Sequence, residues 1–587
     1  MVKYFFTIDH GGNFRWPPSG KPRIYNSLRR KKSKLNIRLL AAKDANNAAR
    51  VKKLEDEVGL LSFKIKEAIV RHLDESERRA VGKIKENPKY FYSYAKSFSK
   101  VKNRISTLLD GEKKLVTDSK DLADILQTQF CSVFSDPNCP DKSMPEFALP
   151  PISTQDAELV LSPELIEEAI SEIKLDSDPG PDGIPAILLK RFKVYERVVR
   201  KHMVQYLEAN NLLSDKQHGF RFNRSCLTQM LDHFDSIFEG LTKGNDTDSI
   251  YLDFAKAFDK VDLDLLLRKL KRYGFHQKLI GWIQSFLTDR EQVVVVNGVH
   301  SNSAKVLSGV PQGSVLDPLF FLLFINDLEE VVKASKVSFF ADDTRVSKQI
   351  SRFEDCALLQ ADLLRIIEWA NRNNMKLHEQ KFELLNHLHN RKNFTSELPF
   401  YVETLLYKVS GEVTLYPVEH VRDLGVVVSS DLSWSRHISN MVTKARSTLS
   451  WVFSVFKTRD RTVMITLYKS LVRSLLEYCC PLWDPTRATE MQMLEGVQRT
   501  FTSCIGGLND MNYWERLVHL RLMSLQRRRE RYAILMMWKI LLLFLTAAIL
   551  SSLIPQDMVP RLLSLLCQSV APFATRRSTT VHSQLEE

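Results

Sequence analysis

Residues 338–346 read SFFADDTRV, an apolar run typical of a buried strand that is followed at once by Asp342 and Asp343. One interpretation is a plain hairpin turn, because aspartate side chains bond their own backbone and tolerate unusual dihedral angles. The other is a site that needs negative charge at a strand end. The stretch alone favours the turn, so a second acid at the end of a similar strand would change the balance.

Such an acid is Asp253 in SIYLDFAKAFD (249–259), where strand-forming residues precede a helix-like segment. Ionised carboxylates repel at short range, so gathering Asp253, Asp342 and Asp343 on one sheet edge is costly without a cation. Magnesium prefers one or two carboxylates plus substrate phosphates. Two such ions activate a 3′-hydroxyl and stabilise a leaving pyrophosphate. We expect a magnesium site; an ordinary strand end remains the alternative.

The composition indicates a polyanionic partner. The 587 residues include 83 Lys and Arg against 70 Asp and Glu, a net charge of +13. This balance suits phosphate neutralisation, but it does not separate nucleic acid from an anionic membrane. The eight cysteines are dispersed without a CxxC pair. A disulfide framework or zinc site is therefore not expected, and a reducing intracellular compartment fits best.

Two local runs bear on partners. RRKKSK (29–34) is a candidate for phosphate binding or nuclear import, although such runs are commonly just solvated. The apolar run at 540–554 has 15 residues, fewer than the roughly 20 needed to span a bilayer. We expect a buried terminal helix or unrelated sequence there, and no stable membrane association.

The middle of the chain mixes strands and helices. A linker is expected at 135–151, a helix with Ser162 as its N-cap, a hairpin around Asn297-Gly298 and an amphipathic helix over 357–374. Helices and hairpins in this order predict an α+β fold with an antiparallel sheet, not a doubly wound one.

Five motifs follow one another along the chain: YLDFAKAFD, SGVPQGS, FADD, MKLHEQKFE and VRDLGVVVS. In this order they resemble the reverse transcriptase of non-LTR (LINE-type, jockey-like) retrotransposons, from Lys83 to about residue 540. The resemblance implies a right-hand polymerase of fingers, palm and thumb that copies RNA into DNA. The expected divisions are a basic helical extension and linker (1–150), truncated fingers (151–235), palm (236–435), helical thumb (436–540) and an apolar then polar tail (541–587).

The resemblance assigns the catalytic residues position by position. Asp253 and Asp342 are implied to bind two Mg²⁺ ions, for which Mn²⁺ can substitute, and Asp343 is the neighbouring third acid. The backbone carbonyl of Phe254 is implied to be a further metal ligand. Lys381 matches a lysine that protonates the departing pyrophosphate; a solvated lysine is the alternative.

The resemblance also assigns nucleotide-binding residues. Phe258 matches the bulky residue under the sugar, whose ring would clash with a 2′-hydroxyl and select deoxynucleotides. From spacing alone, a core aromatic is the simpler interpretation of Phe258. Gln312 and Gly313 are implied to line the incoming nucleotide, and Arg221 to contact a template or nucleotide phosphate.

Two further features concern the primer. The hairpin that holds the primer end in the family corresponds to Asp423, Leu424, Gly425 and Val426. In LQRRRERY (525–532), four arginines fan around a predicted helix. They either contact phosphates of the template–primer duplex or form a solvated face.

The implied partners are template RNA, a DNA primer in target DNA, and dNTPs. The implied place of action is the nucleus, after synthesis in the cytoplasm. The oligomeric state is not indicated.

The chain departs from the family pattern in three ways. LLKRFK (188–193) runs directly into VYERVV, as if a finger block had been deleted. Asp317 stands where the family usually has Gly, and its charge would be costly if buried. No endonuclease motif precedes the polymerase motifs, and the C-terminal run does not match. Two functions therefore stay open: an active polymerase, and an inactive remnant that binds RNA or DNA without polymerising.

Overall fold

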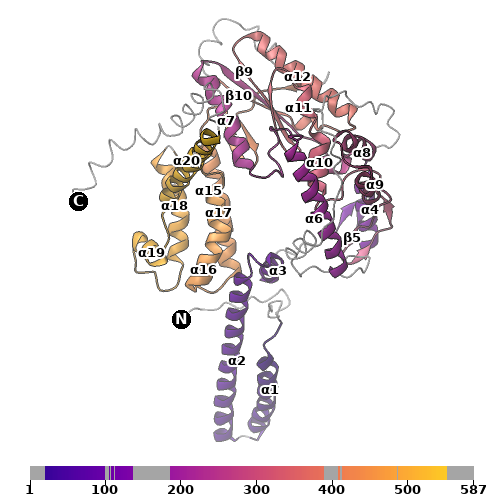
Figure 1. The fold of residues 1–587 in the computed structure, drawn as a ribbon. Helices are drawn as coiled ribbons and strands as arrows, with labels where there is room; N and C mark the ends of the chain where they lie inside the picture. The colour runs from indigo at the N-terminus through magenta and orange to yellow at the C-terminus, as the bar shows by residue number, and fades with distance from the viewer. Residues whose placement is uncertain are drawn as a thin grey trace, which may run out of the picture. The chain divides into compact units, whose positions relative to one another are not determined.

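The computed structural model describes residues 20–45, 47–98, 105, 107–111, 113–135, 186–388, 407–409, 413–485 and 487–550. These residues divide into two compact units. The first contains the described residues of Met1–Asn103 with Ser435–Phe544, and the second those of Arg104–Trp434 with Leu545–Glu587. The ribbon in Figure 1 carries the element labels used below.

The second unit is built on a four-stranded antiparallel sheet in the order β10-β3-β9-β8. Its strands are β3 (Asp246–Leu252), β8 (Lys336–Phe340), β9 (Asp343–Ile350) and β10 (Glu383–His387). Side chains alternate between the two faces of a strand. In β3, Ile250 and Leu252 accordingly enter the main hydrophobic core, while Thr247 lies against Gly240 on the other face.

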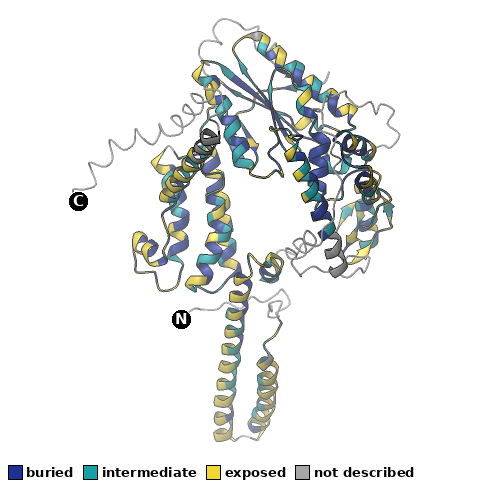
Figure 2. Cartoon of the chain, viewed as in Figure 1, coloured by how far each residue is buried: buried dark blue, intermediate teal, exposed yellow. Residues whose placement is uncertain are grey.

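Helices cover both faces of this sheet. On the core face lie α10 (Asp317–Ile325), which is apolar on every side, and α12 (Phe353–Arg372). Figure 2 shows the dark blue of buried residues along the sheet and α10. Gly240 belongs to α7 (Cys226–Thr242), which covers the opposite face. The predicted amphipathic helix is confirmed, because its stripe in α12 is fully buried: Leu359, Leu363, Ile366 and Ala370.

The predicted Asn297-Gly298 hairpin is also confirmed. β5 (Val295–Val296) pairs with β6 (Val299–His300), and both turn residues have positive φ, 52° and 87°. This is the two-residue turn whose twist matches that of paired strands. Further short elements pack nearby: β1 (Leu108–Leu109), β2 (Leu115–Val116), α4 (Ser119–Cys131), β4 (Glu291–Gln292) and β7 (Ala304–Lys305).

The suspected deletion lies within α6 (Ala186–Ala209), which is a single continuous helix through residues 192–194. Beyond this point, Val199, Met203 and Leu207 are buried in the same core as the sheet. The join therefore continues the helix without a break. The unit is completed by α8 (Leu263–Arg272), α9 (Gln277–Leu287), α11 (Leu328–Val331), β11 (Tyr407–Lys408), β12 (Thr414–Leu415), β13 (His420–Asp423), β14 (Val426–Ser429) and the short helices η1 (Ala257–Lys260) and η2 (Glu379–Lys381).

The first unit is helical and combines the N-terminal segment with residues of the range Ser435–Phe544. Its elements are α1 (Arg23–Asp44), α2 (Ala48–Gly82), α3 (Pro88–Phe98), α15 (Ser435–Val455), α16 (Arg461–Leu467), η3 (Tyr468–Val472), α17 (Arg473–Leu476), α18 (Ala488–Ser503), α19 (Tyr513–Leu520) and α20 (Leu525–Leu550). The buried Glu77 carboxylate of α2 accepts N–H bonds from Lys457 and Thr458, both 2.9 Å. The helices expected as an N-terminal extension therefore pack with the helices expected as a thumb.

Several sequence expectations lie outside the described residues, including the Ser162 helix start and most of the 135–151 linker. Of the described helices, none is long and apolar enough to span a bilayer. The arginines of α20 are divided: Arg528 binds Glu477, Arg529 is buried near Asp484, and Arg527 and Arg531 are exposed. Two of the four arginines, Arg528 and Arg529, therefore contribute to packing within the unit.

Candidate active site

The FADD stretch forms the turn between β8 and β9. Phe340 pairs with Asp343, so Ala341 and Asp342 are the two turn residues, and Ala341 has a φ of 56°. The plain-turn interpretation is thus structurally correct. It does not exclude chemistry, because the same turn carries both acids.

Asp253 lies at the same edge of the sheet. It follows β3, whose last residue Leu252 pairs with Thr344 directly after the turn acids. The Asp253 carbonyl accepts the N–H of His378 at 2.8 Å, which holds its backbone beside the 376–378 segment. Adjacent antiparallel strands therefore bring Asp253, Asp342 and Asp343 together, although 89 positions separate the first two in the sequence.

The electrostatics of the three acids reflect this proximity. Burial and then the charge of Asp253 raise the pKa of Asp342 above its usual value. Desolvation, followed by the charges of Asp342, Asp423 and Asp253, raises the pKa of Asp343 to about 6. Mutual repulsion between carboxylates is the condition that a bound cation relieves.

The residues present fit a magnesium ion held by two carboxylates and substrate, not a preformed protein cage. Within the described ranges, no group of three or more His, Cys, Asp or Glu side chains is placed to hold a metal ion. Lys381 Nζ instead forms an ion pair with Asp253 at 2.9 Å. Magnesium commonly takes only one or two carboxylates and completes its shell with water and phosphate oxygens. The pair Asp253 and Asp342 meets that requirement.

Phe254 directly follows Asp253 in the sequence. Phe254 forms an isolated antiparallel bridge with Leu377. The hydrogen bonds of this bridge run from Ala255 N–H to the Lys376 carbonyl and from His378 N–H to the Asp253 carbonyl. The expected role of the Phe254 carbonyl as a metal ligand is compatible with this ladder and stays a prediction.

The acid turn is supported by the segment 216–219, which the sequence analysis did not select. His218 N–H bonds the Phe339 carbonyl at 2.9 Å, and Phe339 N–H bonds that of Lys216 at 3.0 Å. The buried Gln217 amide oxygen accepts N–H bonds from Ala341 and Gly219, at 3.1 and 2.8 Å. Gln217 is therefore a positioning residue; in the sequence it stands four residues before Arg221, in QHGFR (217–221).

The SGVPQGS loop packs tightly onto η1. Gly309 N–H bonds the Val261 carbonyl at 2.8 Å, and Val310 N–H bonds that of Phe258 at 3.0 Å. A Cβ on Gly309 would stand 2.7 Å from both Cα and O of Asp259, and its φ is +83°. Only glycine fits there. The tip of the loop is exposed: Gln312 Nε2 donates to Asp259 at 2.8 Å, and Gly313 has open space around it.

Phe258 stacks on Phe321 of α10, with ring centroids 4.4 Å apart. It is partly buried against the main core. In this structure its ring thus contributes to packing, as the simpler interpretation held. The nucleotide-facing role remains a prediction.

Asp317 bears part of the cost that its charge suggested, because burial raises the pKa of its carboxyl group above the usual value. It is buried, but its carboxylate accepts the Gly313 N–H at 2.9 Å. It is the first residue of α10, where the helix dipole favours an acid. Its φ is not positive, so no glycine is needed for the backbone. The carboxylate ties the start of α10 to the loop tip.

Arg221 differs from the expectation of a phosphate contact. Its side chain is buried and pairs with both carboxylate oxygens of Glu208, at 3.2 and 2.7 Å. Its third nitrogen donates to the Ser214 carbonyl at 2.7 Å. The guanidinium is therefore used internally, to hold this segment against α6.

Residues 423–426 form a hairpin. Asp423 pairs with Val426 across Leu424 and Gly425, whose φ values are 46° and 86°. The buried Asp423 carboxylate forms an ion pair with Arg345 of β9. Arg345 also donates to Ser338 of β8 at 3.1 Å. The hairpin expected to hold the primer is thus connected by charge to the strands that carry the acid turn, a link that the sequence analysis missed.

Comparison with known proteins shows what the chain is similar to. Residues 185–428 match the family described as Reverse transcriptase (RNA-dependent DNA polymerase). The chain is 26% identical over 343 residues to the probable RNA-directed DNA polymerase from transposon X-element of Drosophila melanogaster, covering 57% of this chain and 36% of that protein. It is 26% identical over 297 residues to the RNA-directed DNA polymerase from mobile element jockey of the same species, covering 49% and 31%. The chain thus spans about a third of these relatives.

Among solved structures, a telomerase from Candida albicans aligns with a TM-score of 0.33 at 11% identity, over 58% of this chain and 60% of that one. The described elements confirm the α+β class, and the family match agrees with a right-hand polymerase. Residues 185–428 therefore match the reverse transcriptase family, and the chain is similar to the RNA-directed DNA polymerases of the X-element and jockey elements.

Proposed function

We propose that this chain is an RNA-directed DNA polymerase that transfers a nucleotide from a dNTP to the 3′-hydroxyl of a DNA primer. The observation that carries the proposal is the meeting of Asp253 and Asp342 at one edge of the β3–β9–β8 sheet. Asp253 directly follows β3, and Asp342 lies in the turn between the neighbouring strands β8 and β9. The reverse transcriptase match over 185–428 supports the same conclusion.

In this proposal, Asp253, Asp342 and the Phe254 carbonyl hold two magnesium ions, for which manganese can substitute, and Asp343 adds negative charge beside them. When bound, these ions would activate the primer 3′-hydroxyl and stabilise the charge on the leaving pyrophosphate. Lys381 Nζ, 2.9 Å from Asp253, is the nearby proton donor for that pyrophosphate.

The nucleotide and primer are held by neighbouring loops. Gln312 and Gly313, exposed at the loop tip, are placed to receive the incoming dNTP, with Phe258 below the sugar. The 423–426 hairpin supports the primer end. The partners are template RNA, a DNA primer within target DNA, and dNTPs. Because target DNA is chromosomal in such elements, the nucleus is the proposed place of action.

Primer extension tests the proposal directly. The full chain is incubated with an RNA template, an annealed DNA primer, dNTPs and Mg²⁺, and is compared with Asp342→Asn and Asp253→Asn. We expect incorporation by the wild type and at least a hundredfold loss in each variant, since electrostatic stabilisation is the main catalytic contribution. Glu354→Gln, an exposed acid of α12, is the matched control and keeps full activity. Equal incorporation by wild type and Asp342→Asn would refute the assignment.

Metal binding has a readout independent of activity. A ligand that binds only the native state raises the melting temperature. We expect added Mg²⁺ to raise the melting temperature of the wild type more than that of the double variant Asp253→Asn/Asp342→Asn. An equal shift in both proteins would place the metal elsewhere.

An alternative is a remnant that binds nucleic acid without polymerising. Two observations favour it: Arg221, the implied phosphate contact, is occupied by Glu208, and the Phe258 ring stacks on Phe321. No incorporation by the wild type, with RNA binding retained, would establish this alternative.

A further inference from the structure

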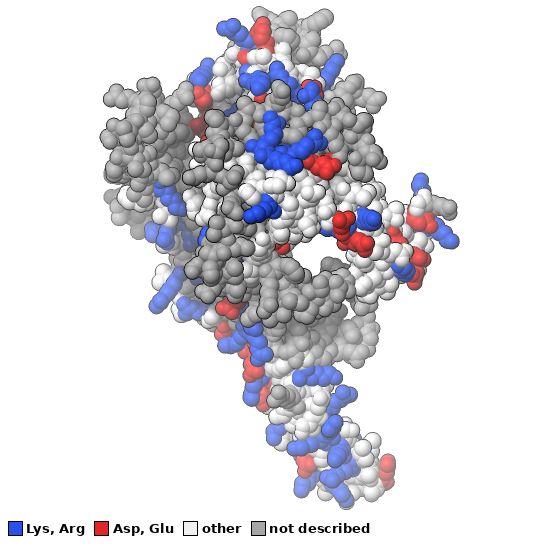
Figure 3. All heavy atoms as spheres, turned by 45° about the vertical axis from the view of Figure 1, so that its right-hand side comes forward, with Lys and Arg blue, Asp and Glu red and all other residues white. Residues whose placement is uncertain are grey.

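α1 carries a concentration of positive charge that the catalytic site does not use. Its 22 residues contain eight Lys or Arg and a single acid, Asp44 at the last position. Figure 3 shows Lys and Arg side chains along the helical hairpin at the bottom of the view. The neighbouring α2 is different, because it contains both acids and bases along its length.

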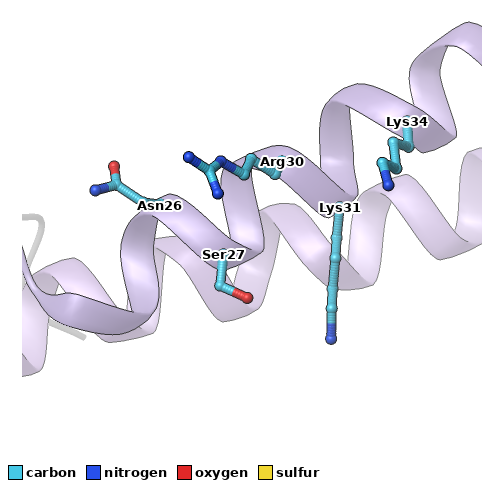
Figure 4. A pocket seen from close by; sticks show the side chains of 5 residues that line it. All are labelled: Asn26, Ser27, Arg30, Lys31 and Lys34. Carbon is cyan, nitrogen blue, oxygen red and sulfur yellow. The ribbon is translucent and has the colours of Figure 1, made fainter.

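Four of the eight positive charges of α1 lie in one stripe. Asn26, Arg30 and Lys34 are spaced by four residues, and Ser27 and Lys31 repeat that spacing one position later, so they share one side of the helix. These five residues line an open hollow of about 440 Å³, and Figure 4 labels their side chains. All five are exposed. Arg38 continues the stripe one turn beyond Lys34.

No acid neutralises this stripe within the described residues. Of the cations of α1, Lys43 at the far end pairs with Glu55 at 2.8 Å. On α2, Arg71 pairs with Glu67 at 2.9 Å. Among the ion pairs of the described chain, none includes Arg30, Lys31, Lys34 or Arg38.

This arrangement opposes the stability of the helix itself. Like charges four residues apart, such as Arg30 and Lys34, repel. A ligand that supplies a row of negative charges would relieve this repulsion. A phosphodiester backbone is such a row.

We propose that the stripe formed by Asn26, Ser27, Arg30, Lys31, Lys34 and Arg38 binds the phosphodiester backbone of single-stranded RNA. The choice of RNA rests on the proposed function. The cations contact phosphates without sequence preference, and the Asn26 amide and Ser27 hydroxyl supply neutral hydrogen bonds. The exposed apolar side chains of α1, Ile24, Ile37 and Leu40, are spread along the helix, which argues against a membrane-facing surface.

The test is the salt dependence of RNA binding by the full chain. The logarithm of the association constant for a short single-stranded RNA of arbitrary sequence is measured over roughly 50–200 mM salt. In Arg30→Gln/Lys31→Gln/Lys34→Gln/Arg38→Gln, the slope should fall by roughly 3, at about 0.7 per phosphate contact on a single strand. Glutamine keeps the helix propensity. Arg30→Lys/Arg38→Lys, which keeps the charge, should leave the slope unchanged.

A matched control compares Arg30→Gln/Lys34→Gln with Lys43→Gln/Arg71→Gln, which removes two cations already paired with acids. The first pair should lower the slope by about 1.4 and the second by much less. Equal effects would show that RNA binding depends on the net charge of the protein and not on the stripe, and would overturn the proposal. So would an unchanged slope in the quadruple variant with its helical circular dichroism intact.

Two further outcomes separate this surface from other functions. If the quadruple variant loses binding to phosphatidylserine vesicles but keeps its RNA slope, the stripe is a membrane surface and the proposal fails. Asp342→Asn should keep the wild-type slope. If the wild type does not polymerise but the quadruple variant still shows the expected fall in slope, the polymerase proposal is refuted and the RNA-binding proposal stands.

Discussion

Arg345 and Asp423 form a buried ion pair between β9 and the 423–426 hairpin, 78 positions apart in the sequence. Burial raises the pKa of Asp423, while the Arg345 guanidinium acts to lower it. Because Arg345 follows Asp343 by only two residues, this pair fixes the hairpin relative to the edge of the sheet that carries the acids.

Breaking that pair should be costly. Arg345→Met leaves Asp423 buried without a partner, and we expect a loss of about 3–5 kcal/mol in the free energy of unfolding. The double variant Arg345→Met/Asp423→Leu should recover most of that loss, since no charge remains buried. Urea unfolding measures both. Arg372→Met, which breaks the exposed pair with Glu368, should cost less than about 1 kcal/mol. Equal losses in the two single variants would contradict the buried-pair account.

The raised pKa of Asp343, about 6, makes a prediction for pH. Its usual value is 3.8, so the native state binds this proton more readily than the unfolded state does. Ionised Asp343 therefore destabilises the native state above pH about 6, and this effect disappears as the pH falls towards about 4. Asp343→Asn should raise the melting temperature at pH about 7.5 and leave it nearly unchanged at pH about 4.

Asp355 is the control with the opposite sign. Burial acts to raise its pKa, but hydrogen bonds from Ser351 and from the Arg352 N–H lower it overall. Asp355→Asn should therefore reduce the melting temperature at pH about 7.5, with the loss shrinking at lower pH. If both variants shifted in the same direction, the assigned pKa directions would be wrong.

The two glycines of the SGVPQGS loop separate backbone strain from packing. Both have positive φ, +83° at Gly309 and +90° at Gly313, but only Gly309 has atoms within 4 Å of an added Cβ. Gly313→Ala should cost about 1–3 kcal/mol in stability through strain alone. Gly309→Ala should cost clearly more and should lower primer extension as well, because the loop must move off Asp259. Chemical unfolding gives the difference, and equal costs would contradict the packing account.

Asp317→Gly restores the residue usual in the family and should nevertheless destabilise this chain. The variant loses the bond from Gly313 N–H, worth roughly 1.5–3 kcal/mol for a charged acceptor, and places glycine in a helix. Asp317→Asn, which keeps an acceptor oxygen, should lose less. A higher melting temperature for Asp317→Gly would show that the buried carboxylate is a net cost.

The sequence by itself determined the elements whose signals are local. The FADD turn, the Asn297-Gly298 turn and the buried stripe of α12 depend on residues a few positions apart, where strand and helix periodicity act directly. The pairing of strand-end acids was also predictable, because the two strands carry the same pattern. The order of the motifs indicated the family.

Only the tertiary structure decided which side chains meet. Gln217 accepts a hydrogen bond from Ala341 in the turn, Arg221 forms an ion pair with Glu208, and Arg345 forms an ion pair with Asp423. In each case the partner lies on another element, and no periodicity within one segment specifies it. Burial makes these contacts matter, since a charge or amide removed from water must be satisfied by whatever group the fold brings beside it.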